Sequence, residues 1–389
     1  MLHTIVFYKG EPMKTNNNLT KIEFPMIRHF NMEAMKFDNI IKLTIGEPHF
    51  TPPTEVQNAA IKAIQNDEYR YVLSEGRDDT KKAILAYVKK HFNQQYNEDE
   101  IMITVGSTEA LSSTLTALIN PGDEVIIPSP AYTGYAPLVT LNNAKTVFVD
   151  TIKDDFQIRY HTFNESITSK TKCIVLNYPN NPTGVSLDAK SITDIIRIAK
   201  EHGIYIILDE IYNRLMIDQF TSITDTSVRD KIIIVNGLSK SHSLTGWRIG
   251  YVLASKPLIK LIMKVHQYVV VGVNTITQFA ATQIDCDIDE RIEYYKSNVL
   301  YAYERLTNMG LNVVKPNGTY YIFPEVPYDS EKLFYDLLEK EKVAIIPGTC
   351  FGNYPKHIRI SCACDFLDLK EALNRIERLL TDFSNLNSK

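Results

Sequence analysis

Residues 232–253 read IIIVNGLSKSHSLTGWRIGYVL, a stretch that sets one lysine between two apolar runs. The first run, Ile232–Val235, and the second, Ile249–Leu253, have the length and composition of buried β-strands. Small and hydroxyl-bearing residues surround Lys240 between these runs, and Arg248 follows eight positions later. The pattern predicts a lysine presented just beyond the end of a strand, in a loop bounded on both sides by buried sheet.

Lys240 is the first candidate for a chemical role. Desolvation among small residues at a strand end lowers the pKa of a lysine, and the neutral amine can attack a carbonyl to form a Schiff base. Arg248 is close enough in sequence to hold a phosphate on the same ligand, because a planar guanidinium suits phosphate oxygens. Together they indicate an aldehyde cofactor that carries a phosphate, which is pyridoxal phosphate. A surface loop with ordinary basic residues is the alternative, and the rest of the chain argues against it.

Strands and helices alternate through the middle of the chain. Amphipathic stretches such as Ala189–His202 separate several short apolar runs. This alternation predicts an α/β fold with a three-layer, mainly parallel sheet, whose ligands bind at the carboxyl ends of the strands. Besides the two runs that flank Lys240, the expected strands are Ile101–Thr104, Glu124–Ile127, Thr146–Val149, Cys173–Leu176 and Ile204–Leu208.

The pattern changes after about residue 285. A long charged helix, expected over Asp287–Met309, leads into short strands and a last helix, Phe366–Leu380. We therefore predict a large cofactor-binding domain and a smaller α+β domain that the N-terminal segment completes. The predicted boundaries are 47–284 for the large domain and 15–46 with 285–389 for the small one.

Residues 1–14 precede the first organised pattern and are a candidate disordered extension. They lack the basic leader, long apolar centre and cleavage site of a secretory signal. Met13 is an alternative natural start to Met1.

Composition narrows the class of protein. The 389 residues are 44% hydrophobic and 23% charged, which is ordinary for a soluble globular protein, and the net charge of −4 argues against a general nucleic-acid binder. No apolar run approaches the roughly 20 residues that span a bilayer. The five cysteines have neither zinc-site nor redox-pair spacing, so we expect reduced thiols, no metal site and a cytoplasmic location.

Polar residues follow two of the other predicted strands. Gly106 permits a tight turn before a helix that should begin at Ser107 or Thr108, where free N–H groups make an anion site, although Ser and Thr also cap helices routinely. Asp209 directly follows five apolar residues, and its carboxylate could pair with a protonated cofactor ring nitrogen. Tyr212 could reach the ring hydroxyl. A helix N-cap is the alternative role for Asp209.

Three further residues stand in informative contexts. Asn181 lies in the octet Asn177–Gly184, whose two prolines and one glycine make a rigid turn, and the peptide bond before Pro182 is a candidate cis bond. Tyr132 could stack on a pyridine ring or be an ordinary core tyrosine. Arg359 lies between two isoleucines of an alternating strand, where it is either an exposed edge residue or a bidentate clamp for a substrate carboxylate.

In this order, the motifs resemble the fold-type I aminotransferases of class I/II, from about Ile40 to Leu380. The lysine motif, Asn-Pro-Thr-Gly and Asp-x-x-Tyr are specific in combination. The run from Gly237 to Arg248 is most similar to the branch that holds bacterial N-acetyl-diaminopimelate and aromatic aminotransferases. The resemblance implies pyridoxal phosphate as cofactor, an aspartate-aminotransferase-like large domain, and a homodimer with shared active sites.

The resemblance also assigns roles to residues. The catalytic set would be Lys240, which binds the cofactor and moves the proton, Asp209, which pairs with the ring nitrogen, and Tyr212. Asn181 would bond the ring hydroxyl together with Tyr212, and Tyr132 would stack on the ring. The phosphate would be bound by Gly106, Ser107, Thr108, Ser239 and Arg248, together with Tyr71 of the partner subunit. The substrate α-carboxylate would be bound by Arg359, Asn181 and the backbone of Gly46.

Four positions depart from the family pattern. Gly237 stands where many relatives have a phosphate-binding serine, His49 replaces a frequent aspartate, and Thr80-Lys81 replaces Leu-Arg. These departures concern phosphate affinity and substrate preference, and they leave the reaction type unchanged.

The implied function is the transfer of an amino group by a ping-pong mechanism, with glutamate as the usual donor. The acceptor would be a 2-oxo acid or an oxo-pimelate derivative. A C–S β-lyase on the same fold is the alternative, because its contacting residues would be almost identical. A transcription regulator with an aminotransferase-like domain would need an N-terminal DNA-binding domain, and only about 40 residues precede the resemblance.

Overall fold

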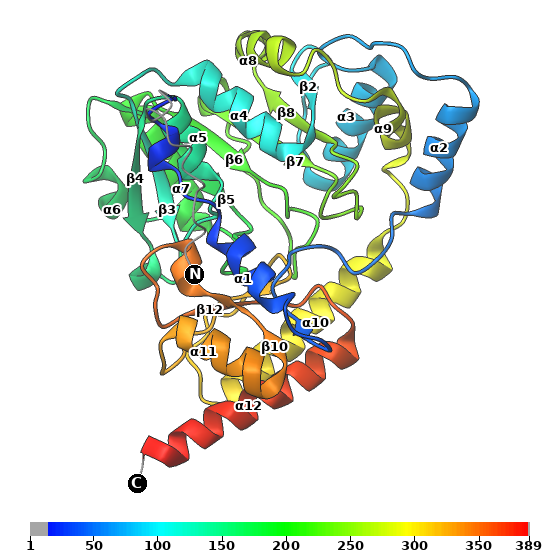
Figure 1. Cartoon of the computed structure of the whole chain (residues 1–389). Helices are drawn as coiled ribbons and strands as arrows, with labels where there is room; N and C mark the ends of the chain where they lie inside the picture. The colour runs from blue at the N-terminus through cyan, green and yellow to red at the C-terminus, as the bar shows by residue number, and fades with distance from the viewer. Residues whose placement is uncertain (1–14, 388–389) are drawn as a thin grey trace, which may run out of the picture.

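A seven-stranded sheet organises the larger part of the chain in this computed structural model, which describes residues 15–387 (Figure 1). Its strand order is β2-β8-β7-β6-β5-β3-β4, and β8 alone runs antiparallel to its neighbours. The mainly parallel sheet expected from the sequence is confirmed. The strands are β2 (Ile101–Thr104), β3 (Glu124–Ser129), β4 (Lys145–Asp150), β5 (Thr171–Asn177), β6 (Tyr205–Asp209), β7 (Ile232–Gly237) and β8 (Gly250–Ala254).

Helices cover both faces of this sheet, so the three-layer prediction also holds. Successive residues of β6 divide between two hydrophobic clusters: Ile206 and Leu208 belong to one, and Ile207 belongs to the other. Because side chains alternate across a strand, these clusters lie on opposite faces. The first cluster includes residues of α2 (Thr54–Gln65), α3 (Asp78–Phe92) and α7 (Ala189–His202), and the second includes residues of α4 (Gly106–Leu118), α5 (Tyr135–Leu141) and α8 (Lys256–Val269).

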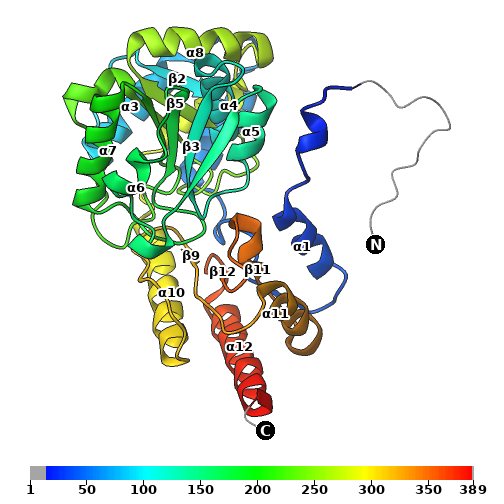
Figure 2. The same ribbon diagram turned by 90° about the vertical axis from the view of Figure 1, so that its left-hand side faces the viewer.

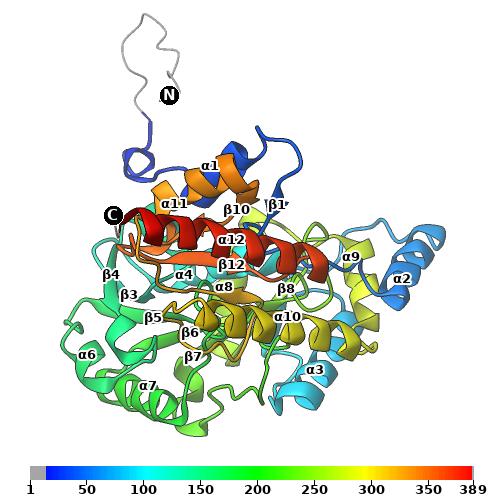
Figure 3. The ribbon, with the colours of Figure 1, turned by 90° about the horizontal axis from the view of Figure 1, so that it is seen from below.

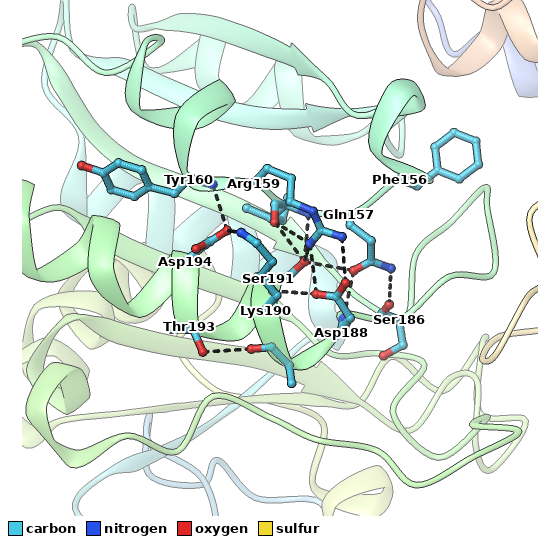
Figure 4. A network of polar contacts seen from close by, with 12 residues as sticks. Phe156, Gln157, Arg159, Tyr160, Ser186, Asp188, Lys190, Ser191, Thr193 and Asp194 are labelled. Carbon is cyan, nitrogen blue, oxygen red and sulfur yellow. Dashed lines mark hydrogen bonds and ion pairs between the residues drawn. The ribbon is translucent and has the colours of Figure 1, made fainter.

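The two short helices α6 (Tyr160–Asn164) and α9 (Thr275–Ala280) complete this part of the chain. A polar network at the start of α7 fastens the segment that leads out of the Asn177–Gly184 loop (Figure 4). Asp188 caps the helix by accepting from the Ser191 N–H, and it forms a two-bond ion pair with Arg159 at 3.1 and 2.8 Å. The Gln157 amide donates to the Ser186 carbonyl at 2.9 Å. These contacts hold residues 186–191, which follow the Asn177–Gly184 loop, against residues 157–159 of the same chain.

A second group of elements lies below the large sheet in the view of Figure 2. A three-stranded antiparallel sheet has the order β11-β12-β9, and a separate parallel pair joins β1 to β10. Helices α10 and α12 pack side by side across this region, as seen from below in Figure 3. The elements are α1 (Met26–Ala34), β1 (Ile41–Lys42), α10 (Asp289–Asn308), β9 (Tyr321–Ile322), α11 (Ser330–Asp336), β10 (Val343–Ala344), β11 (Ile346–Pro347), β12 (Ile358–Ser361) and α12 (Phe366–Asn387).

The N-terminal segment joins this second group. Phe30 of α1 and Leu43 share a hydrophobic cluster with Phe334 and Leu373, and Ile41 pairs with Val343. The domain boundaries given above stay a prediction, and the candidate extension 1–14 lies outside the described residues. Within the described chain, no helix combines the length and the apolar character that crossing a bilayer requires.

Element ends differ slightly from the expectations. The predicted strands all form, with ends that match or are shifted by no more than two residues. Helix α4 begins at Gly106, earlier than the expected Ser107 or Thr108, and α12 continues past Leu380 to Asn387. Cys362 and Cys364 follow the end of β12, and all five cysteines are free thiols.

Candidate active site

A cavity of about 340 Å³ opens at the carboxyl ends of the parallel strands, where the second group of elements meets the large sheet. This is the place where open α/β sheets bind their ligands. The structure brings together residues from segments more than 300 positions apart in the chain. The predicted site residues that line the cavity are Gly46, Ser107, Thr108, Tyr132, Asn181, Asp209, Tyr212, Ser239, Lys240, Arg248 and Arg359.

Lys240 enters the cavity from the loop that follows β7. Its Nζ donates to the Gly46 carbonyl oxygen at 2.6 Å. Burial lowers the pKa of the Lys240 amine, and the charges of Arg359 and Arg248 act in the same direction. His242 anchors the loop by hydrogen bonding through Nε2 to the Ile284 carbonyl oxygen at 2.8 Å. The amine is thus held at a fixed place and shifted toward its neutral form.

Asp209 is the last residue of β6, and its carboxylate is buried. Tyr135 donates its hydroxyl to Oδ2 at 2.7 Å, and the Ile211 N–H donates to Oδ1 at 3.3 Å. Burial nevertheless raises the pKa of Asp209 to about 6. The alternative role as a helix N-cap is wrong, because a turn follows β6 and no helix begins there.

Arg359 lies on β12 and is only 2% exposed, so the alternative of an exposed edge residue is wrong. Its Nη1 donates to Asn181 Oδ1 at 2.9 Å and its Nη2 to the Thr44 carbonyl oxygen at 2.5 Å. The guanidinium carbon lies 4.4 Å from the centre of the Tyr321 ring. Its Nε is buried without a hydrogen-bond partner among the described residues. A buried cation with an unused donor at a cavity wall is suited to bind an anion.

The opposite end of the cavity is formed by the start of α4 and by Arg248. Gly106 has φ of +72°, and a Cβ there would lie 2.6 Å from Arg248 Nη2. The positive φ favours glycine at this position, and the missing Cβ leaves room for the Arg248 guanidinium beside the turn. Ser107, Thr108 and Ser239 line the same end. The combination of a helix N-terminus, hydroxyl groups and a guanidinium is suited to bind an anion.

The position of Gly237 gives a physical reason for its departure from the family pattern. It is the last residue of β7, and a Cβ there would lie 2.9 Å from the Ile249 carbonyl oxygen. The backbone of β7 and its neighbour β8 leaves no room for a serine at this position without a shift.

Tyr132 and Tyr212 both line the cavity, in different surroundings. Tyr132 packs edge to face against Tyr135, with ring centres 5.4 Å apart. The buried Tyr212 hydroxyl lies 3.2 Å from that of Tyr321. Each presents an aromatic side chain to the ligand space.

Tyr71, a predicted site residue, does not line the cavity. It is 93% exposed, in the loop between α2 and α3. Gly106 is adjacent to the cavity through its contact with Arg248, although it is absent from the lining.

The Asn177–Gly184 loop is held by its own side chains. Asn181 N–H donates to Asn177 Oδ1 at 2.9 Å, and Thr183 N–H donates to Asn180 Oδ1 at 3.1 Å. Among the described residues, the cis peptide bonds are Ser129–Pro130 and Tyr178–Pro179. The candidate cis bond before Pro182 is therefore wrong.

Sequence reasoning missed several residues of the site. Tyr135 was overlooked although it lies three positions after Tyr132, and Asn177, whose Nδ2 donates to the Asp209 carbonyl oxygen at 3.0 Å, opens the octet. Ile27 and Asn31 of α1 also line the cavity. No local pattern marks these two, because only the packing of α1 brings them to the site.

The cavity fits a phosphorylated pyridine aldehyde. Lys240 supplies an amine of lowered pKa, and the start of α4 with Arg248 has the donors and the positive charge that suit a phosphate. Within residues 15–387, Asp209 has hydrogen-bond donors but no ion-pair partner, as expected for a carboxylate that awaits a cationic ring nitrogen. The described residues contain no cluster of His, Cys, Asp and Glu arranged to hold a metal ion.

The chain belongs to the aminotransferase class I and II family, which it matches over residues 38–376. It is a pyridoxal-phosphate-dependent aminotransferase of fold type I. The probable N-acetyl-LL-diaminopimelate aminotransferase of Bacillus subtilis is 40% identical over 371 residues, covering 93% of this chain and 94% of the relative. The aspartate aminotransferase of Thermotoga maritima is 34% identical over 368 residues, covering 92% of this chain and 97% of the relative.

Solved structures agree with this assignment. The structure of the Thermotoga maritima aspartate aminotransferase matches with a TM-score of 0.90 at 33% identity, covering 94% of this chain and all of that chain. The aromatic aminotransferase of Pyrococcus horikoshii matches with a TM-score of 0.85 at 32% identity, covering 91% and 99%. The aspartate-aminotransferase-like fold is confirmed.

Proposed function

We propose that this aminotransferase takes the amino group of L-glutamate and passes it to a 2-oxo acid or an oxo-pimelate derivative in a ping-pong reaction. The observation that carries the proposal is the meeting of Lys240, Asp209 and Arg359 in one cavity. The name of the Bacillus subtilis relative supports an acylated oxo-pimelate acceptor. Aromatic oxo acids and oxaloacetate are the other acceptors to be compared.

The residues of the cavity divide between the two ends of the cofactor. Gly106, Ser107, Thr108, Ser239 and Arg248 would hold the phosphate. Asp209 would keep the ring nitrogen protonated, Asn181 and Tyr212 would bond the ring hydroxyl, and Tyr132 would pack on the ring. When bound, pyridoxal phosphate supplies an electron sink for the carbanion formed at the substrate Cα.

Lys240 would perform the proton transfer. Its lowered pKa favours the neutral amine, which can accept the Cα proton of the substrate at Nζ and later return it. The Gly46 carbonyl oxygen accepts a hydrogen bond from Nζ and so orients the amine. The chain thus provides a general base that becomes the general acid of the same half-reaction.

Arg359 would fix the substrate by its α-carboxylate. Its two terminal nitrogens are already positioned by Asn181 and Thr44, so little side-chain entropy is lost when a carboxylate binds. The backbone of Gly46 lies at the same wall of the cavity. This arrangement would hold Cα near the Lys240 amine.

We further propose a cytoplasmic homodimer in which Tyr71 reaches the phosphate site of the partner subunit. Exposed apolar side chains surround Tyr71, which supports an interface there. The free cysteines support a reducing compartment.

An absorbance spectrum of the purified protein tests the function. With pyridoxal phosphate bound, the yellow band should bleach on addition of L-glutamate and return on addition of an acceptor oxo acid. The rate of return with an N-acetylated oxo-pimelate, an aromatic oxo acid and oxaloacetate ranks the acceptors. A band that persists with glutamate, together with release of pyruvate and ammonia from a cysteine-like substrate, would establish the lyase alternative instead.

A further inference from the structure

Glu109 of α4 and His266 of α8 meet behind the phosphate end of the cavity. Their side chains approach to 3.2 Å, between Glu109 Oε1 and His266 Nδ1. We propose that Glu109 and His266 are positioning residues that fix the first turn of α4 and thereby set the affinity of the site for the phosphate of pyridoxal phosphate. The inference rests on the proposed function, in which this turn binds the phosphate.

The first turn of α4 lacks the usual side-chain cap. Val105 occupies the N-cap position, and its apolar side chain makes no capping hydrogen bond. Its backbone N–H instead donates to Glu109 Oε2 at 3.1 Å. The Glu109 side chain therefore closes a ring around Gly106, Ser107 and Thr108, the residues that would contact the phosphate.

Glu109 is in turn held by two other donors. Ser113, one turn further along α4, donates its hydroxyl to Oε1, and His266 approaches the same oxygen. The Glu109 side chain is only 11% exposed, so each of these contacts replaces water that burial has removed. Held in this way, the carboxylate is directed to the Val105 N–H.

The burial of His266 is hard to explain unless it serves Glu109. Its side chain is fully buried, and its Nε2 has no hydrogen-bond partner among the described residues. Because a carboxylate can only accept, a hydrogen bond at this distance requires His266 Nδ1 to be the donor to Glu109. An apolar residue of similar size would avoid the unpaired nitrogen, so the one bond that His266 makes accounts for its presence.

A misplaced Glu109 would oppose phosphate binding directly. A carboxylate freed from its donors can turn to the N–H groups at the helix N-terminus, which favour any anion. It would then compete with the phosphate for the same donors. Loss of the His266 contact is therefore expected to weaken the phosphate site without removing any group that touches the cofactor.

The test compares the dissociation constants of pyridoxal phosphate and of pyridoxal, which lacks the phosphate, in His266→Leu and His266→Asn. Both aldehydes react with Lys240 alike, so the ratio of the two constants isolates the phosphate contribution. We expect His266→Leu to raise the constant for pyridoxal phosphate about tenfold and that for pyridoxal less than twofold. His266→Asn keeps a donor near the Nδ1 position and should restore the ratio to within about threefold.

One control variant and one alternative variant complete the test. Ile262→Val alters the same buried face of α8 without contact to Glu109 and should leave the ratio unchanged. If His266→Leu does not fold, Glu109→Gln gives the same test from the other partner, because the amide cannot accept from all three donors. A ratio that matches the wild type in the folded variant overturns the inference.

The same measurement separates this inference from the proposed function. If the wild-type protein binds pyridoxal phosphate no more tightly than pyridoxal, the phosphate site at α4 is itself wrong. If the wild type prefers the phosphorylated aldehyde and His266→Leu keeps that preference, only the positioning role fails.

Discussion

The neighbours of Lys240 set the pKa and the orientation of its amine. Burial and two nearby guanidinium groups lower the pKa of its amine, while the Gly46 carbonyl oxygen fixes its direction. These effects come from three segments that are distant in the sequence. The residue itself was recognisable from its motif, because small residues and Arg248 accompany it, whereas the contact with Gly46 depends on how the N-terminal segment packs.

Lys240→Ala should lower the rate of transamination by about 10³-fold or more, since it removes the group that transfers the proton. The fold should persist, because the side chain reaches into a cavity and supports no core packing. Single-turnover kinetics with L-glutamate and circular dichroism measure the two effects. Lys256→Ala, which breaks only an exposed ion pair with Asp99, is the matched control. Retained transamination in Lys240→Ala would refute the assigned role.

Arg359→Ala should raise the KM for amino acid substrates roughly 10- to 100-fold, the loss expected for a two-bond contact to a carboxylate. The dissociation constant for pyridoxal phosphate should change less than threefold. Steady-state kinetics and a titration with the cofactor measure these quantities. Because Arg359 also donates to Asn181, equal losses of substrate and cofactor binding would indicate a structural role instead.

At the scale of elements, the strands of the large sheet other than the exposed edge strand β4 were predictable because both of their faces are buried. Such strands are continuous apolar runs, and the runs coincide with the strands to within two residues. The carboxyl ends of strands were predicted too early where a polar residue continues the hydrogen-bonded pairing between strands. Asn177 pairs with Asp209, and Asp209 pairs with Val235. Backbone pairing does not depend on side-chain polarity, so a strand end predicted from hydropathy falls one or two residues before the observed end.

The end of β6 also carries Glu210, a buried carboxyl group next to Asp209. Burial raises the pKa of Glu210 to about 7, against the opposing hydrogen bonds from Ser222 and Gln94. A carboxyl whose folded pKa lies above its unfolded value of 4.5 contributes stability that is complete below pH 4.5 and is lost as the pH rises through 7. The wild type should therefore lose stability across this window.

Glu210→Gln should remove this loss, because the amide cannot ionise. Between pH 5 and pH 8, the free energy of unfolding of the variant should gain about 2–3 kcal/mol relative to the wild type. Urea unfolding at the two pH values measures the difference. Glu304→Gln, at an exposed position of α10, is the control. Parallel pH profiles of Glu210→Gln and wild type would contradict the prediction.

At the scale of the whole molecule, one face carries a group of exposed apolar side chains. They come from α2, from the loop that holds Tyr71, and from the end of α8 with its following loop. The two loops are joined, since Ser74 donates to the Val271 carbonyl oxygen and Thr275 to that of Arg70, both at 2.8 Å. The members are Ile61, Ile64, Tyr69, Tyr71, Leu73, Tyr268, Val269 and Val271.

Tyr268→Glu should convert the proposed dimer to a monomer, because it places a charge in the centre of an apolar interface. Cofactor affinity should fall with it, by about tenfold, if Tyr71 reaches the phosphate of the partner subunit. Sedimentation and cofactor titration measure both effects. Phe148→Glu, on the edge strand β4 at the far side of the sheet, is the control. A wild-type monomer that binds the cofactor fully would refute the shared site.

The sheet, its layers and most of the cavity could be predicted from the sequence, because each of them depends on local apolar runs and motifs. These patterns did not give the approach of α1, whose Ile27 and Asn31 line the cavity, or the pair formed by Glu109 and His266. Those contacts arise when helices pack, and no spacing in the chain encodes them.

The pairing of β1 with β10 affects how the enzyme is made. Ile41 leaves the ribosome early, but its partner Val343 follows roughly three hundred residues later, which at 5–20 residues per second is on the order of 15–60 s. The apolar face of α1 packs against residues of the same late segment, such as Phe334 and Val343. Since Gly46 lies just beyond β1 and accepts the hydrogen bond from Lys240, the nascent chain cannot complete this wall of the cavity in its final form before Val343 has been synthesised.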